Sequence, residues 1–151
     1  MKLFPARRSD DRAYTMIEII AVLLVIGILA AVAVSRFLSA RQDLVAQADI
    51  AKAHLRFAQL KALNDDTAPW GIAFAGDSYT LQYNGAAAAI SLPAENSNTR
   101  TLSSGITITT PLAVSFDSWG SPGASNIPIT LTDGGATTTI TITGNTGHIT
   151  P

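Results

Sequence analysis

A single carboxylate, Glu18, stands at the start of an uncharged apolar run that extends from Ile19 to Ser35. An ionised side chain at the edge of a membrane-length apolar segment is costly and is usually retained for a function. We therefore take Glu18 as the first candidate functional residue. The alternative interpretation is that Glu18 only extends its carboxylate to the polar membrane surface.

The other side chains that could do chemistry are few and scattered. His54 and His148 lack the neighbouring groups of a catalytic or metal site, so we expect them to be surface or packing residues. Ser103, in a Ser-Ser-Gly sequence, lacks the strand–turn–helix context of a nucleophile elbow. These observations predict that the chain is not an enzyme and binds no cofactor.

Composition excludes further classes of protein. With a net charge of −1 over 151 residues, strong electrostatic binding of nucleic acid is not encoded. The absence of cysteine excludes disulfides and thiolate zinc sites. The acidic residues Asp65, Asp66 and Asp77 could contact a calcium ion, but they lack EF-hand spacing, and the first two better fit the end of a helix. We therefore predict no metal site.

The apolar run belongs to a helix of membrane length. From Tyr14 to Ser35 a helix would span roughly 30 Å, the thickness of a bilayer hydrocarbon core. Basic residues are more frequent on its N-terminal side, which predicts a cytoplasmic N-terminus. They are Lys2, Arg7, Arg8 and Arg12 before the run, against Arg36 and Arg41 after it.

Two cleavage sites are compatible with export. Cleavage after Ala13 would remove a basic leader and leave the apolar segment as an anchor, whereas cleavage after Ala33, in Ala-Val-Ala, would release a secreted binding protein. We favour the first because the uncharged run exceeds the ~7–15 residues of an ordinary signal core. In addition, Glu18 is unusual in such a core, and helical patterning continues past Ala33.

The segment Ala13-Tyr-Thr-Met-Ile-Glu-Ile resembles the class III signal of type IV prepilins and type II secretion pseudopilins. In that family a prepilin peptidase cuts before an aromatic residue and methylates the new amine, which implies cleavage between Ala13 and Tyr14. Glu18 then takes the fifth mature position, where the family has Glu, and Gly27 the fourteenth, where it often has Gly. Ala13 replaces the usual Gly, and Ser35 stands where many pilins have a helix-kinking Pro.

The proposed cleavage gives Glu18 a partner. The new amine of Tyr14 is a positive charge at the membrane end of a helix, and the Glu18 carboxylate of a neighbouring copy would neutralise it. Each charge then offsets the desolvation of the other. Such a pair would set the axial register between subunits.

Past Arg36 the helix becomes amphipathic on two sides. What we call the small-residue stripe consists of Phe37, Leu44, Ala48, Ala51, Leu55, Ala58 and Ala62, and the opposite stripe of Ala46, Ile50, Ala53, Phe57 and Leu60. One stripe would cover a sheet and the other would meet a neighbouring subunit. The sequence leaves this assignment open, although small residues allow closer approach and favour the first stripe as the covering face. Residues 64–66 end the helix.

After Pro69 the period changes to that of strands, with Ile facing inward and Thr outward in an antiparallel sheet with one solvated face. Residues 76–78 predict a hairpin, and residues 95–100 a mobile polar loop. The expected strands are 70–74, 79–83, 88–92, 106–110, 112–116, 127–131 and 138–143, with a short last strand at residues 148–149.

The closing pattern is similar to that of H-type minor pseudopilins and FimT-like minor pilins: Phe116-Asp-Ser-Trp-Gly-Ser-Pro, two strands, and Thr-Gly-His-Ile at residues 146–149. The alternative is simply a strand and a turn, with Trp119 packed in the core. The resemblance implies the type IV pilin fold, an α+β fold with a leader at 1–13, a transmembrane helix at 14–35, its amphipathic half at 36–66 and an antiparallel β domain at 67–151.

The function implied by the resemblance is that of a structural subunit, minor rather than major. Its partners would be other pilin or pseudopilin subunits, prepilin peptidase, and an inner-membrane assembly platform with a motor ATPase. The chain would be held in the bacterial inner membrane with its C-terminal domain in the periplasm, and then enter a filament. A membrane-anchored sensor that never assembles is a competing interpretation. The sequence leaves open whether the machine is for secretion, pilus formation or DNA uptake.

Overall fold

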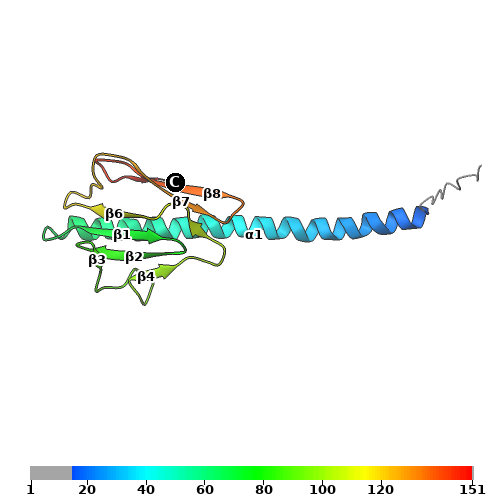
Figure 1. The fold of residues 1–151 in the computed structure, drawn as a ribbon, viewed down its shortest axis with the longest axis horizontal. Helices are drawn as coiled ribbons and strands as arrows, with labels where there is room; N and C mark the ends of the chain where they lie inside the picture. The colour runs from blue at the N-terminus through cyan, green and yellow to red at the C-terminus, as the bar shows by residue number, and fades with distance from the viewer. Residues whose placement is uncertain (1–14, 151) are drawn as a thin grey trace, which may run out of the picture. The chain divides into compact units, whose positions relative to one another are not determined.

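The computed structural model describes residues 15–150, with the backbone alone for residues 34–40. The fold is α+β, with one long helix and antiparallel β-sheets (Figure 1). The chain divides into two compact units between Phe37 and Leu38. Ala13 and Tyr14, where we predict cleavage, lie outside the described residues.

The helix, α1, extends over the 48 residues Met16–Leu63. It ends where residues 64–66 were expected to end it: the Asn64 side chain bonds the carbonyl of Leu60 at 2.7 Å, and a turn follows. Its first part, Met16–Ala33, has a mean hydropathy of 2.9, and the protein buries none of it. This segment is therefore long and apolar enough to cross a membrane.

Within residues 15–150, nine strands form two antiparallel sheets, where we expected one. The strands are β1 (Trp70–Ala75), β2 (Ser78–Tyr83), β3 (Ala86–Ala87), β4 (Thr99–Thr101), β5 (Thr107–Ile108), β6 (Leu112–Phe116), β7 (Ile127–Thr132), β8 (Thr137–Ile142) and β9 (Ile149–Thr150). One sheet has the order β3-β2-β1-β6, with β4 also paired to β2, and the other has the order β5-β7-β8-β9. The expected hairpin is confirmed, because Ala75 pairs with Ser78 across a two-residue turn that begins at Gly76, with φ +58°.

Two local expectations were wrong. Residues 88–92 form no strand, because β4 occupies the edge of β2 along Ser78–Thr80 and leaves β3 only the end of that edge, at Gln82 and Tyr83. Conversely, the segment 95–100, which we expected to be a loop, contains the start of β4 at Thr99 and Arg100. Both errors concern which strand reaches one shared edge, and local sequence does not encode that.

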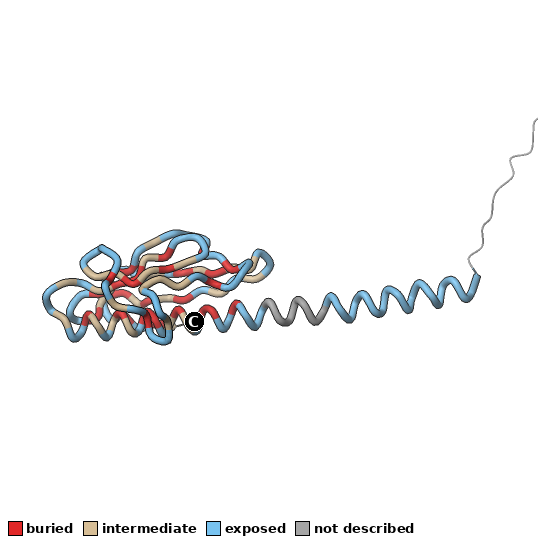
Figure 2. The backbone as a smooth tube through the Cα atoms, turned by 90° about the horizontal axis from the view of Figure 1, so that it is seen from below, coloured by how far each residue is buried: buried red, intermediate tan, exposed pale blue. Residues whose placement is uncertain are grey.

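The core lies between the second part of α1 and the sheets, and Figure 2 shows the strands lying along one side of that part of the helix. Every described member of the small-residue stripe, from Leu44 to Ala62, is at most 2% exposed, whereas Leu60 in the opposite stripe is 57% exposed. The side chain of Phe37 is not among those described. The small-residue stripe is thus the covering face, as its side-chain sizes favoured.

The strands supply the larger core residues by strict alternation. In β7 and β8 the residues Ile129, Leu131, Ile140 and Ile142 are buried and the threonines between them are more exposed, as the period of two predicted, while Ile127 at the start of β7 is partly buried. Gly71 in β1 is required by close approach, because a Cβ there would lie 2.0 Å from the carbonyl oxygen of Val114 in the paired strand β6.

Candidate functional site

The first candidate site is the N-terminal end of α1, around Glu18. Thr15 precedes the helix, and its hydroxyl accepts a hydrogen bond from the Glu18 backbone N–H at 3.3 Å. The Thr15 carbonyl accepts the first helical bond, from Ile19. Thr15 is therefore the N-cap and Glu18 the third helical residue, the spacing of a capping box.

This cap was readable in the sequence as Thr-x-x-Glu, but our sequence interpretation missed it. It gives Glu18 a second possible role, because a glutamate at this position stabilises a helix start through its charge and its side-chain hydrogen bonding. A test of Glu18 as an assembly residue must therefore use variants that remove its charge and its contribution to the helix cap separately.

The carboxylate itself lies on an exposed, apolar part of α1, beside Ile19, Val22 and Leu23. Within residues 15–150 the carboxylate of Glu18 makes no ion pair or hydrogen bond. An anion on an apolar helix surface is poorly placed in lipid unless a cation from outside the described residues meets it. The geometry therefore leaves the carboxylate available to a partner.

Gly27 is not brought to the same place as Glu18. The two residues are nine positions apart, or two and a half helical turns, so they lie on opposite sides of α1. No atom that the structure describes beyond its chain neighbours and its own helix backbone lies within 4 Å of a Cβ built at Gly27. Nothing in the described part of the chain therefore requires glycine at this position.

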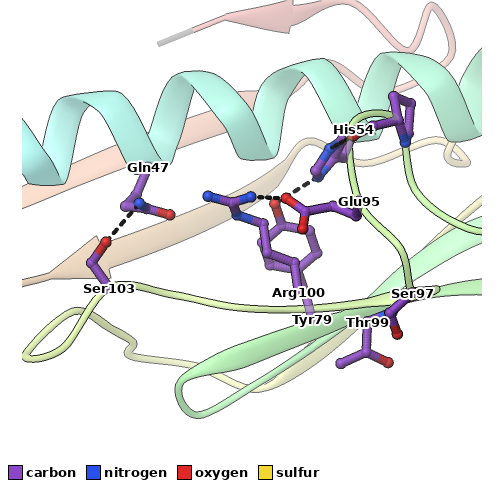
Figure 3. A network of polar contacts seen from close by, with 9 residues as sticks. Gln47, His54, Tyr79, Glu95, Ser97, Thr99, Arg100 and Ser103 are labelled. Atoms are coloured by element: carbon purple, nitrogen blue, oxygen red, sulfur yellow. Dashed lines mark hydrogen bonds and ion pairs between the residues drawn. The ribbon is translucent and has the colours of Figure 1, made fainter.

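The second candidate, a buried polar cluster, joins α1 to the segment that contains β4 (Figure 3). His54 is 3% exposed and bonds the Pro93 carbonyl through Nε2 at 3.0 Å and the Tyr79 hydroxyl through Nδ1 at 2.7 Å. Because a carbonyl can only accept, Nε2 carries the proton and Tyr79 donates to Nδ1. Burial lowers the pKa of His54, and the Arg100 charge adds to this, while burial raises the pKa of Tyr79.

The same cluster contains two more contacts. Gln47 donates to the Ser103 hydroxyl at 2.8 Å, and Glu95 forms an ion pair with Arg100. This cluster holds the segment from Pro93 to Ser103 against α1. Among the described residues no general base contacts Ser103, and both ring nitrogens of His54 are already hydrogen-bonded, to Tyr79 and to Pro93.

Asp65 was considered for calcium and for the end of the helix, and it serves the helix end. Its carboxylate accepts from the backbone N–H of Thr67 at 3.0 Å and from Trp70 Nε1 at 2.9 Å. Hydrogen bonds from Thr67 and Trp70 lower the pKa of this carboxyl. In the part of the chain that the structure describes, no three His, Cys, Asp or Glu side chains are grouped as a metal site would need.

Trp119 is not packed in the core, which contradicts the alternative interpretation of its motif. Its side chain is 85% exposed, on the loop that follows β6. Asp117 Oδ1 accepts from the backbone N–H groups of Trp119 and Ser121, both at 2.9 Å. Gln59 of α1 donates to the carbonyl of Gly120 at 2.8 Å, so the loop is fixed to the helix while the indole faces solvent.

Comparisons of the chain with protein-family models, with curated proteins and with solved structures find no match. The arguments for function therefore come from residues of this chain. They are an available carboxylate at a capped helix start, an exposed apolar helix segment, and a β domain packed on the small-residue stripe of the same helix.

Proposed function

We propose that this chain is a structural subunit of the type IV pilin and type II secretion pseudopilin class, of the minor, H-type kind. The observation that carries the proposal is the Glu18 carboxylate, which has no partner among residues 15–150, at the start of an apolar helix segment that this part of the protein leaves wholly exposed. Such a surface requires either lipid or other apolar helices around it, and the carboxylate requires a cation at the same depth.

Assembly would then exchange one apolar environment for another. The subunit is stored in the inner membrane, prepilin peptidase removes residues 1–13, and a platform with a motor ATPase transfers α1 from lipid to neighbouring helices. The apolar surface of Met16–Ala33 stays dry throughout, so the transfer avoids the cost of exposing it to water. The amine of Tyr14 in one copy pairs with Glu18 in the next.

Three variants separate the charge of Glu18 from its role in the cap. Glu18→Ala removes both, Glu18→Gln removes the charge but keeps a side chain that suits the capping box, and Thr15→Ala removes the N-cap alone. We expect both Glu18 variants to insert and mature normally but to fail in assembly, because a neutral residue inserts more easily and cannot neutralise the amine. Thr15→Ala should lose about 1 kcal/mol of helix stability and still assemble.

The measurement is the amount of each variant in sheared filaments, or secretion activity, relative to its amount in the membrane. Normal assembly of Glu18→Gln together with failure of Thr15→Ala would assign Glu18 to the cap and refute the charge pair. Normal assembly of all three would remove the charge pair from the proposal, except for a subunit at the filament tip, which has no neighbour above it.

The mature N-terminus tests the class itself. Sequencing of the mature protein should give Tyr14, N-methylated, and Ala13→Arg should leave the leader attached because the peptidase site is small. A mature protein that starts at Val34 would instead identify a secreted binding protein cleaved after Ala33. Correct maturation without any crosslinks between neighbouring apolar helices would support the anchored sensor.

A further inference from the structure

A polar pocket lies between α1 and the turn that joins β8 to β9. It has a volume of about 360 Å³ and is lined by Arg56, Gln59, Thr146, Gly147, His148 and Ile149. The first two of these residues are neighbours on one face of α1, and the other four are consecutive in the chain. His148, which we expected to be a surface or packing residue, is exposed at this pocket.

The walls of the pocket are fixed by hydrogen bonds. The side-chain amide of Gln59 donates to the carbonyls of Gly120 and Gly147, at 2.8 and 3.0 Å, and so holds the turn against α1. Within the turn, the Gly147 N–H donates to the carbonyl of Thr143 at 2.9 Å. A pocket whose walls are already ordered loses little conformational entropy when a ligand enters it.

The hydrogen-bonding groups that remain available in the pocket are donors. The Arg56 guanidinium has five N–H groups, and within residues 15–150 it makes one long bond, of 3.5 Å to the carbonyl of Ile149, and no ion pair. The Thr146 hydroxyl accepts from the His148 backbone N–H at 3.3 Å, which leaves its own hydrogen to donate. The imidazole of His148 makes no hydrogen bond within the same residues and carries a ring N–H.

The charges around the pocket favour a single negative charge inside it. No carboxylate is among the lining residues. Lys52, one turn before Arg56 on α1, is already paired with Asp49 at 2.6 Å. Asp117 uses its carboxylate on the backbone of its own loop and does not line the pocket. One arginine fork matches the charge and planar shape of a carboxylate, whereas the larger charge of a phosphate would be left partly uncompensated.

We propose that this pocket is a carboxylate-binding site. The Arg56 guanidinium holds the two carboxylate oxygens in its fork, and the Thr146 hydroxyl and the His148 imidazole donate to the same group. The carboxylate belongs either to a free acid or to an acidic side chain of another protein, and two arms of the test separate these sources. No residue of Met16–Ala33 takes part in the site, so the inference does not depend on the proposed function.

The first arm titrates the full chain in detergent micelles with sodium acetate, at constant ionic strength, and follows the His148 backbone N–H by NMR. We expect a shift that saturates with acetate and is absent with chloride. Arg56→Gln should abolish this shift. Arg56→Lys, which keeps the charge but loses the fork, should weaken binding roughly fivefold, the equivalent of one hydrogen bond.

The matched control for the first arm is Arg41→Gln, which removes an exposed arginine of α1 outside the pocket and should leave acetate binding unchanged. Because Arg56 is exposed as well, the remainder of the spectrum should be the same in all variants. A shift that rises linearly without saturation would overturn the proposal. So would saturation by phosphate at a lower concentration than by acetate.

The second arm uses membranes that contain the full chain as Arg56→Lys, treated with a water-soluble carbodiimide. The reagent activates a carboxylate, the introduced lysine amine attacks it, an amide bond forms and the carbodiimide leaves as a urea. An amide to an acidic residue of another protein, reduced by adding Thr146→Val and missing from Arg41→Lys, identifies a protein source. Saturable acetate binding without such an amide identifies a free acid. An amide to an acidic residue of the same chain would show that the pocket is filled from within, and would overturn the proposal.

Discussion

The assignment of the two helix stripes can be tested by placing one charge on each. Leu55 is fully buried against the sheets, whereas Phe57, two residues further, is only half-buried on the opposite side of α1. Loss of the leucine side chain from the core costs about 2–5 kcal/mol. At pH 7 a buried aspartate avoids an unpaired charge by taking up a proton, at a cost of about 4 kcal/mol for a group of ordinary pKa near 3.9.

Leu55→Asp should therefore cost about 6–9 kcal/mol at pH 7, comparable to the 5–15 kcal/mol that holds a typical domain together. The protonation part falls to about 1.5 kcal/mol at pH 5, because less free energy is needed to keep the acid neutral. Leu55→Asn is the matched control: it makes the same cavity and carries no titrating group. The penalty of Leu55→Asp relative to Leu55→Asn should thus shrink as the pH falls.

The assay is thermal melting followed by circular dichroism, on a truncated chain that begins at Arg41. We expect this chain to be soluble, with both helix and strand signals and cooperative melting, because every core residue that the structure describes lies at Leu44 or beyond. Leu55→Asp should abolish the transition, and Phe57→Asp should leave it in place. The reverse outcome would show that the two stripes are assigned the wrong way round, and a wholly helical spectrum would refute the packing of sheets on this helix.

Two further predictions concern the polar contacts that hold the domain together. Burial lowers the pKa of His54 in the folded state below its ordinary value of 6.5, so the unfolded chain binds more protons than the folded protein below that pH. The free energy of unfolding should therefore fall as the pH drops through 6.5 towards the folded pKa. In urea titrations at pH 7.5 and 5.5, His54→Gln should lose most of this pH dependence. Gly147 has φ +64°, and a Cβ there would lie 2.0 Å from the backbone carbonyl oxygen of Gly120 and 2.3 Å from Gln59 Nε2, so Gly147→Ala should cost about 1–3 kcal/mol. Gln59→Ala removes the hydrogen bonds to the carbonyls of Gly120 and Gly147 and should cost a similar amount. Full additivity of the two changes in a double-mutant cycle would contradict their coupling at this contact.

Periodicity predicted the parts of the fold that depend on local spacing. The small-residue stripe is buried, the Ile and Thr alternation of β8 has the expected sides, and α1 ends at Leu63 before the predicted terminating residues. The parts that depend on distant partners were not predictable in the same way. Whether residues 88–92 pair with β2 is decided by competition with β4, which comes later in the chain.

The candidate sites also differ in whether they depend on local sequence or on distant partners. The Thr15 cap was encoded locally and could have been found from its spacing to Glu18. The exposure of Trp119 could not, because its loop is held by a hydrogen bond from Gln59 of the distant helix as well as by the local one that Asp117 accepts. The pairing of Glu18 with a neighbouring amine involves a second molecule and stays a prediction.

The two parts of α1 differ in their burial: the second part contributes to the core, and the first part does not. Small residues from Ala48 to Ala62 let the sheets approach the helix closely, and the strands supply the bulk of the core. None of that core comes from Met16–Ala33, which the protein leaves unburied. In the proposed function, exchange of lipid for neighbouring helices around this segment would therefore remove no contact of the described core, so the free energy of assembly would be separable from that of folding.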